Sequence, residues 1–131
     1  MLRSTDGELF TGALFHAYSP PPGFCFDSLC IDVLMDDPNM EDYNMDLKML
    51  EFLAYSKLQA VSYNTSNVLM TMGEDFTYEN ANMWFKNMDK LKGYFNKNAS
   101  LGLNIIYSTP SCYLKAVKDS SETAGLSWKQ G

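Results

Sequence analysis

Two adjacent carboxylates, Glu74 and Asp75, follow directly after an apolar run and the glycine at position 73. The apolar run, residues 68–72, predicts a buried strand, and an amphipathic helix is expected after the loop. Enzymes with alternating strands and helices place catalytic groups in the loops at the carboxyl ends of their strands. Carboxyl groups there supply acid–base chemistry. Turns are also rich in Asp, so position alone leaves open that Asp75 is a turn or capping residue.

The two carboxylates lie within a longer motif. Residues 72–85 are Met-Gly-Glu-Asp-Phe-Thr-Tyr-Glu-Asn-Ala-Asn-Met-Trp-Phe, and shorter motifs occur at residues 9–12, 18–21, 25–30 and 107–112. The long motif resembles the acid/base segment of family 38 glycoside hydrolases, and the shorter ones follow in that family's order. The resemblance covers nearly the whole chain. It is strongest to the lysosomal-type α-mannosidase branch; a Golgi-type or epididymal-type member is another interpretation, but the Golgi branch departs from the long motif.

The resemblance implies a retaining, zinc-dependent α-mannosidase that hydrolyses terminal α-mannosyl residues of N-glycan-derived oligosaccharides. Residue by residue, Asp75 matches the general acid/base. Tyr18 matches a tyrosine that contacts the sugar, and a core aromatic at a strand end is an equal interpretation. Glu74 is expected to contact substrate or to support Asp75, since a neighbouring negative charge favours a protonated acid.

Other parts of the family's machinery have no match in this chain. No segment corresponds to the nucleophile aspartate, the His-x-Asp pair or the last histidine that ligate Zn²⁺. The resemblance therefore implies that the zinc ligands lie outside residues 1–131, in the remainder of the polypeptide, and that the isolated chain is inactive. The alternative is a truncated or degenerate fragment that is not an enzyme and at most binds sugar weakly.

Bulk properties limit the classes of protein. The 131 residues are 46% hydrophobic, which suffices for one compact core and gives no reason to expect a second domain. The net charge of −6 has the wrong sign for a nucleic-acid-binding protein. No apolar run approaches the length of a membrane span, so no membrane contact is expected. The first residues carry no signal-peptide pattern, and any signal would lie upstream.

Three cysteines leave at least one without a partner in the chain. Cys25 and Cys30 could close a small loop as a disulfide or supply half a metal site. The only histidine, His16, and the remote Cys112 are poor partners for a metal site, so we favour the disulfide. Cys112 is then unpaired here. In the family the matching cysteine bonds to one near the amino end of the mature enzyme.

Two sequons, at Asn64 and Asn98, mark candidate N-glycosylation sites. Such triplets also occur by chance. Together with a disulfide they favour the secretory pathway, and the resemblance implies the lysosome.

Strands are expected at residues 9–18, 68–72 and 103–107, and helices at 41–62, 80–96 and 111–118. Residues 19–41 are expected to be a long loop, and 119–131 a loose polar tail. The first helix is predicted to bury Leu47, Leu50, Ala54, Leu58 and Val61, and the second to bury Trp84, Met88, Leu91 and Phe95.

Strand, loop and helix thus follow one another three times, the pattern of parallel βαβ units. A closed barrel of such units takes roughly 250 residues, about twice this length. We therefore predict an α/β fold, an internal fragment of a barrel spanning residues 1–131. The resemblance implies a seven-stranded α/β barrel as the parent. The isolated fragment is expected to fold poorly, with exposed strand edges and helix faces.

Overall fold

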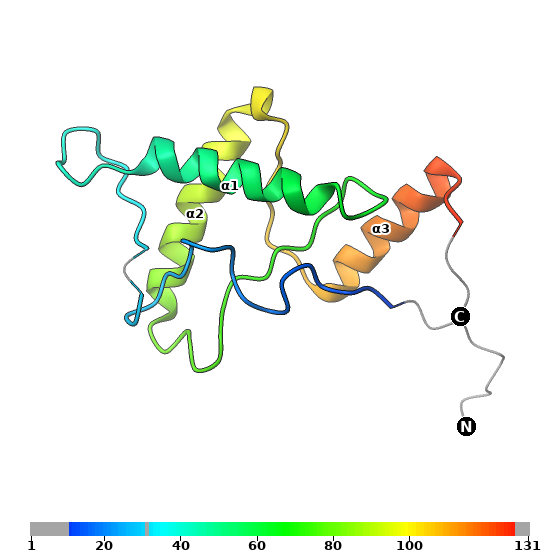
Figure 1. Ribbon diagram of the computed structural model, residues 1–131, viewed down its shortest axis with the longest axis horizontal. Helices are drawn as coiled ribbons and strands as arrows, with labels where there is room; N and C mark the ends of the chain where they lie inside the picture. Colours follow the sequence, from blue (N-terminus) through cyan, green and yellow to red (C-terminus); the bar gives the residue numbers. More distant parts are fainter. Residues whose placement is uncertain (1–10, 31, 128–131) are drawn as a thin grey trace.

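The computed structural model describes residues 11–30 and 32–127 of the chain, and the structure in these ranges is helical (Figure 1). The helices are α1 (Met45–Ala60), α2 (Ala81–Lys97), the single 3₁₀ turn η1 (Ala99–Leu101) and α3 (Pro110–Ala124). The three predicted α-helices are therefore present. No helix among the described residues is long and apolar enough to cross a membrane.

The third helix runs further than predicted. Thr109 caps its first turn by accepting a hydrogen bond from the Cys112 amide at 3.3 Å, and Pro110 occupies the first turn, where proline is tolerated. The helix ends at Gly125, whose φ of +63° suits glycine and whose N–H bonds back to the last turn. Residues 119–124, predicted as a loose tail, are therefore helical.

The predicted α/β barrel fragment is wrong for this structure. Among the described residues, 11–30 and 32–127, none belongs to a strand, so the three predicted strand–loop–helix units are not formed. Residues 9 and 10 of the first predicted strand lie outside the described residues, and residues 15–18 form a turn. The segments at 68–72 and 103–107 are irregular.

Side chains, and not neighbouring strands, bind the backbone of these irregular segments. The Gln59 amide donates to the Leu69 carbonyl at 2.9 Å. The Asn96 amide binds Ile105 twice, accepting from its N–H and donating to its C=O, both at 2.8 Å. A strand exists only through its ladder of backbone hydrogen bonds, so an apolar run without a paired neighbour does not become one.

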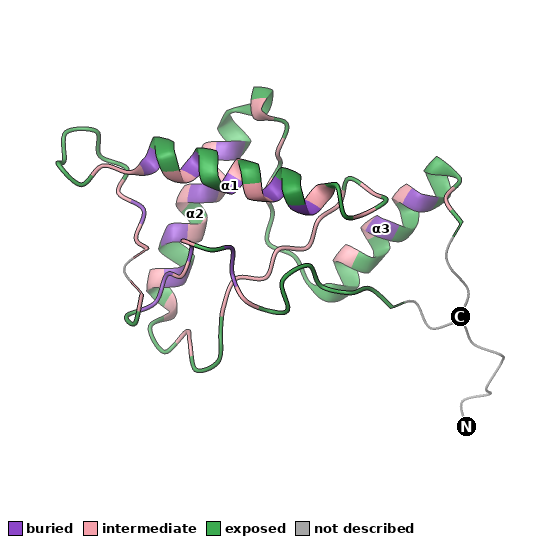
Figure 2. Cartoon of the chain, viewed as in Figure 1, coloured by how far each residue is buried: buried purple, intermediate pink, exposed green. Residues whose placement is uncertain are grey.

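One cluster of buried apolar residues forms the centre of the fold. Buried positions on α1, on α2 and on the segment before α1 are purple in Figure 2. We call this cluster the aromatic core, and it joins the loop at 24–34 to α1 and α2. Its rings meet edge to face or tilted: Phe24 and Phe52 have centroids 5.2 Å apart, and Phe52 and Phe95 5.6 Å. Its members are Phe24, Phe26, Leu34, Met45, Met49, Phe52, Trp84, Leu91 and Phe95.

The buried stripe of α2 agrees with the prediction, apart from Met88, which is only partly buried. The buried face of α1 does not. The predicted residues are exposed, with Leu50 65% and Val61 81% accessible, and the opposite face is buried instead. Because α1 carries apolar residues on both sides, periodicity alone could not select the face that meets the aromatic core.

The long loop before α1 is fixed to α2. The Leu34 amide donates to the buried Asn87 side chain at 2.9 Å, and the Lys90 ammonium donates to the Leu34 carbonyl at 2.6 Å. Lys90 also pairs with Asp36 at 2.7 Å. The disulfide between Cys25 and Cys30 closes the first part of this loop.

Candidate active site

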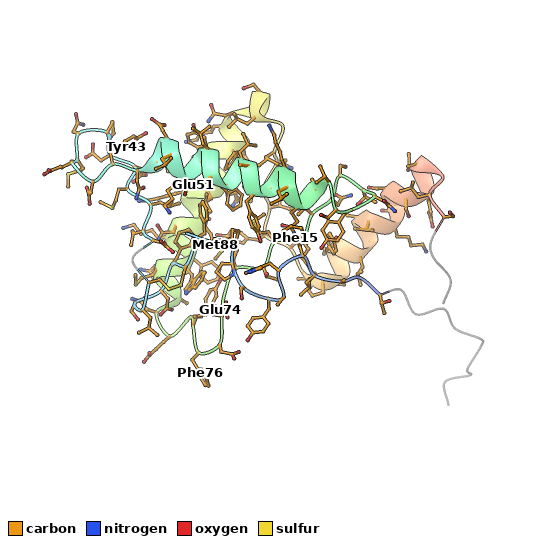
Figure 3. All side chains as sticks on the ribbon, in the orientation of Figure 1. Phe15, Tyr43, Glu51, Glu74, Phe76 and Met88 are labelled. Atoms are coloured by element: carbon orange, nitrogen blue, oxygen red, sulfur yellow. A yellow bond between two sulfur atoms is a disulfide. The ribbon has the colours of Figure 1, made fainter. Side chains whose placement is uncertain are left out.

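The predicted acid lies in a tight turn between the irregular segment 68–72 and α2. The Thr77 hydroxyl accepts from the Glu74 amide at 3.0 Å and donates to the Glu74 carbonyl at 2.8 Å. Phe76 and Tyr78 both have positive φ, at 60° and 72°, which is uncommon for bulky residues. We call residues 73–78 the acid loop. Asp75 is exposed within it, and Phe76 lies at its tip and points away from the molecule (Figure 3).

Tyr18 reaches the acid loop from a distant part of the sequence. Hydrogen bonding to the Asp75 carboxylate, and that carboxylate's negative charge, raise the pKa of the Tyr18 phenol above 10.0; slight burial and the charge of Glu74 act in the same direction. The Thr71 hydroxyl donates to the Ser19 carbonyl at 3.0 Å and so holds the Tyr18 turn beside the acid loop. The three predicted site residues, Tyr18, Glu74 and Asp75, therefore lie together.

Tyr78 connects the acid loop to the aromatic core. Its hydroxyl donates to the Met72 carbonyl at 2.6 Å, just before the loop begins. Its ring stacks on Trp84 with centroids 4.8 Å apart and planes inclined by 14°. The indole N–H of Trp84 in turn donates to the Asp27 carboxylate at 3.1 Å. The site thus rests on the buried part of the fold.

Asp27 is a buried carboxylate that sequence reasoning missed. The Trp84 hydrogen bond lowers the pKa of Asp27 below 3.8 against the opposing effect of burial, and bonds from Leu29, Ser28 and the Tyr78 backbone add to the lowering. Its sequence signal is weak, a lone acid inside the Cys25–Cys30 loop. Its partner Trp84 lies far along the chain, so only the fold reveals the pair.

The remaining predicted residues lie away from Asp75. Cys112 is free and exposed on α3. Asn64 and Asn98 are both exposed, and the side-chain amide of Asn98 donates to the Tyr94 carbonyl at 2.7 Å. A cavity of about 440 Å³ is lined by residues 11–14, 62–65, Leu69 and the first half of α3. It includes the predicted glycosylation residue Asn64 but none of Tyr18, Glu74 and Asp75.

The described residues do not fit the zinc ion that the resemblance implies. Among residues 11–30 and 32–127, no three His, Cys, Asp or Glu side chains gather closely enough to hold a metal. Glu74 and Asp75 supply two carboxylates, but no third ligand from the described part of the chain approaches them.

Known proteins similar to this chain define its class. The sequence model described as "Glycosyl hydrolases family 38 N-terminal domain" matches residues 2–131, which places the chain among the glycoside hydrolases. Human lysosomal alpha-mannosidase is 42% identical over 130 residues, covering 97% of this chain. The lysosomal alpha-mannosidase of Dictyostelium discoideum is 42% identical over 134 residues, and the alpha-mannosidase of Canavalia ensiformis 38% over 120, covering 98% and 91% of the chain.

The chain belongs to glycoside hydrolase family 38. It spans only 12% or 13% of the length of the curated relatives it matches.

Proposed function

We propose that this chain supplies the general acid/base, Asp75, to a retaining, zinc-dependent α-mannosidase of lysosomal type. The substrate would be the terminal α-mannosyl residues of N-glycan-derived oligosaccharides. The observation that carries the proposal is that Tyr18 lies near enough to Asp75, on the exposed acid loop, for this carboxylate to raise the Tyr18 pKa, in a chain whose relatives are named alpha-mannosidases. A proton donor beside a hydroxyl donor is what a glycosidic oxygen and its sugar require.

The proposed chemistry has two proton transfers. The Asp75 carboxylic acid protonates the departing glycosidic oxygen as the bond to the anomeric carbon breaks. The resulting carboxylate then takes a proton from the water that releases the mannose. Since the pKa of Tyr18 is raised, its phenol remains a neutral hydrogen-bond donor throughout. It can bind the Asp75 carboxylate in one step and a sugar hydroxyl in the other.

In a retaining enzyme the second carboxyl group attacks the anomeric carbon, and it lies roughly 5 Å from the carboxyl group of the acid. Glu74 precedes Asp75 in the same turn, and we assign it to substrate contact. The nucleophile and the zinc ligands would come from the remainder of the polypeptide. We also propose that the protein reaches the lysosome through the secretory pathway and carries glycans on Asn64 and Asn98.

The test uses the longest natural polypeptide that carries this chain, at acidic pH with zinc present. Asp75→Asn is compared with Glu74→Gln on α-mannosides with poor and with highly activated leaving groups. Loss of general acid catalysis costs roughly 10²–10⁴-fold, and activated leaving groups need little protonation. We expect Asp75→Asn to lose that factor on the poor leaving group only, and Glu74→Gln to lose much less.

Two results would overturn the proposal. Full activity of Asp75→Asn on the poor leaving group would remove Asp75 from the acid/base role and make Glu74 the next candidate. A folded native polypeptide without α-mannosidase activity would favour the degenerate fragment.

A further inference from the structure

The acid loop is closed by one side chain. The Tyr78 hydroxyl donates to the Met72 carbonyl at 2.6 Å, so the residue at the end of the loop binds the residue just before its start. Tyr78 adopts a φ of +72°, a conformation that a bulky residue keeps only when surrounding contacts enforce it. Asp75 lies between these two fixed points.

Gly73 makes this closure possible. A Cβ at position 73 would lie 3.1 Å from Cε2 of the Tyr78 ring, closer than ordinary van der Waals contact. The absence of a side chain therefore lets the ring pack against the backbone at the start of the acid loop. Glycine favours this close approach, because an added Cβ would require the ring to shift by a few tenths of an ångström.

The Tyr78 ring also connects the acid loop to the disulfide loop. It stacks on Trp84, which is fully buried, and the Trp84 indole donates to Asp27 at 3.1 Å. Asp27 is only 7% exposed and lies between the two cysteines of the disulfide. Three successive contacts thus connect Met72, through Tyr78 and Trp84, to Asp27 in a covalently closed loop.

We propose that Tyr78 and Asp27 are positioning residues for Asp75, holding the acid loop against the disulfide loop through Trp84. The proposal rests on the acid/base function proposed above. Neither side chain reaches the reacting atoms; they limit where the acid loop can place the Asp75 carboxyl. A small displacement of a catalytic group affects the chemical step more than substrate binding.

The test compares Tyr78→Phe with Tyr63→Phe in the full-length polypeptide. Tyr63 is a matched control because its hydroxyl also donates to a backbone carbonyl, that of Ala13 at 2.9 Å, but lies away from Asp75. For Tyr78→Phe we expect kcat on a poor leaving group to fall about tenfold to a hundredfold. KM should stay nearly unchanged, and the loss should largely disappear on an activated leaving group. Tyr63→Phe should leave both rates unchanged.

Asp27→Asn keeps the size of the side chain and removes its charge. It should lower kcat in the same leaving-group-dependent way, by less than Tyr78→Phe. If Tyr78→Phe does not fold, as judged by thermal unfolding, Gly73→Ala decides, because it displaces the same ring while keeping its hydroxyl.

The outcomes separate the two proposals. An Asp75→Asn variant that shows no leaving-group dependence refutes the acid/base function itself. If Asp75→Asn does depend on the leaving group, while the folded positioning variants lose activity equally on both substrates or not at all, only the positioning role is wrong.

Discussion

The two ends of the molecule are held together by different means. Around the crossing of α1 and α2, nine buried apolar side chains form the aromatic core. The other end comprises α3 with residues 11–14 and 62–67, and we call it the α3 end. Among the described residues of the α3 end, only Val117 is a buried apolar side chain. There the side-chain amide of Asn67 donates to the Ala116 carbonyl at 3.3 Å and to the Ser120 hydroxyl at 2.7 Å. These bonds lie beside the cavity of about 440 Å³.

The acid loop is attached to the first of these ends. Through Tyr78 and Trp84 it rests on closely packed rings, whereas the α3 end is joined by a few polar contacts. Local stability follows the density of buried contacts, so the aromatic core should open rarely and the α3 end often. Changes at the α3 end should therefore leave Asp75 where it is.

The largest contrast is expected from removing an aromatic ring. Phe95→Ala in the full-length polypeptide should lower the local free energy of unfolding of α2 by about 3–5 kcal/mol, because Phe95 is fully buried. Val117→Ala should lower the local free energy of unfolding of α3 by roughly 1.5 kcal/mol. Hydrogen exchange of amides in each helix measures both. Equal losses would mean that the two ends are packed alike.

A smaller effect is expected from opening the disulfide. Replacing Cys25 and Cys30 together with serine frees a short loop and should cost about 2 kcal/mol at the aromatic core. Cys112→Ser is the control, since this thiol is exposed and free on α3. Hydrogen exchange of α1 and α2 amides gives the comparison, and a double variant as protected as the control would contradict it.

The cap of α3 should have a confined effect. Thr109→Ala removes the acceptor for the Cys112 amide and should cost about 1 kcal/mol of helix stability. The loss should appear in the exchange of α3 amides and not in α2. Unchanged hydrolysis of both kinds of leaving group is expected as well, and a fall in kcat would show that the α3 end does influence Asp75.

The smallest effect concerns a half-exposed ion pair. A hydrogen bond from Lys90 lowers the pKa of Asp36 below 3.8, so the pair stabilises the fold above that pH and loses its effect as pH falls through the lowered pKa. Solvent screening limits the cost of Asp36→Asn near neutral pH to under about 1 kcal/mol. Unfolding of both proteins at pH 6 and pH 2.5 tests this.

In that experiment the difference in stability between native protein and Asp36→Asn should be smaller at the lower pH. Glu122→Gln is the control, because its pair with Lys118 on α3 is more exposed. A difference as large at pH 2.5 as at pH 6 would assign the effect of Asp36 to packing.

Local patterns predicted the helices well where one apolar stripe was unambiguous. Trp84, Leu91 and Phe95 recur on one side of α2, and that side is buried. On α1 the same reasoning selected the wrong face, because Leu50 and Val61 compete with Met49 and Phe52 for the core. The strands failed for a different reason: an apolar run specifies burial, and pairing depends on a neighbour that the run itself does not encode.

The candidate site divides in the same way. Motif order suggested Tyr18, Glu74 and Asp75, and the structure places them together, while their catalytic roles stay predictions. The supporting contacts could not be predicted, because Asp27 meets Trp84 across 57 positions of sequence. No local periodicity encodes a hydrogen bond over that separation.

The exposure of Phe76 has a practical consequence for protein engineering. Its side chain is 99% exposed, beside Asp75. Position 76 therefore suits a fluorescent label: Phe76→Cys, in a Cys112→Ser background so that the other exposed thiol does not react, would carry a dye beside the proposed acid. Its emission would report when a sugar arrives there, whereas a label at Gly73 would collide with the Tyr78 ring.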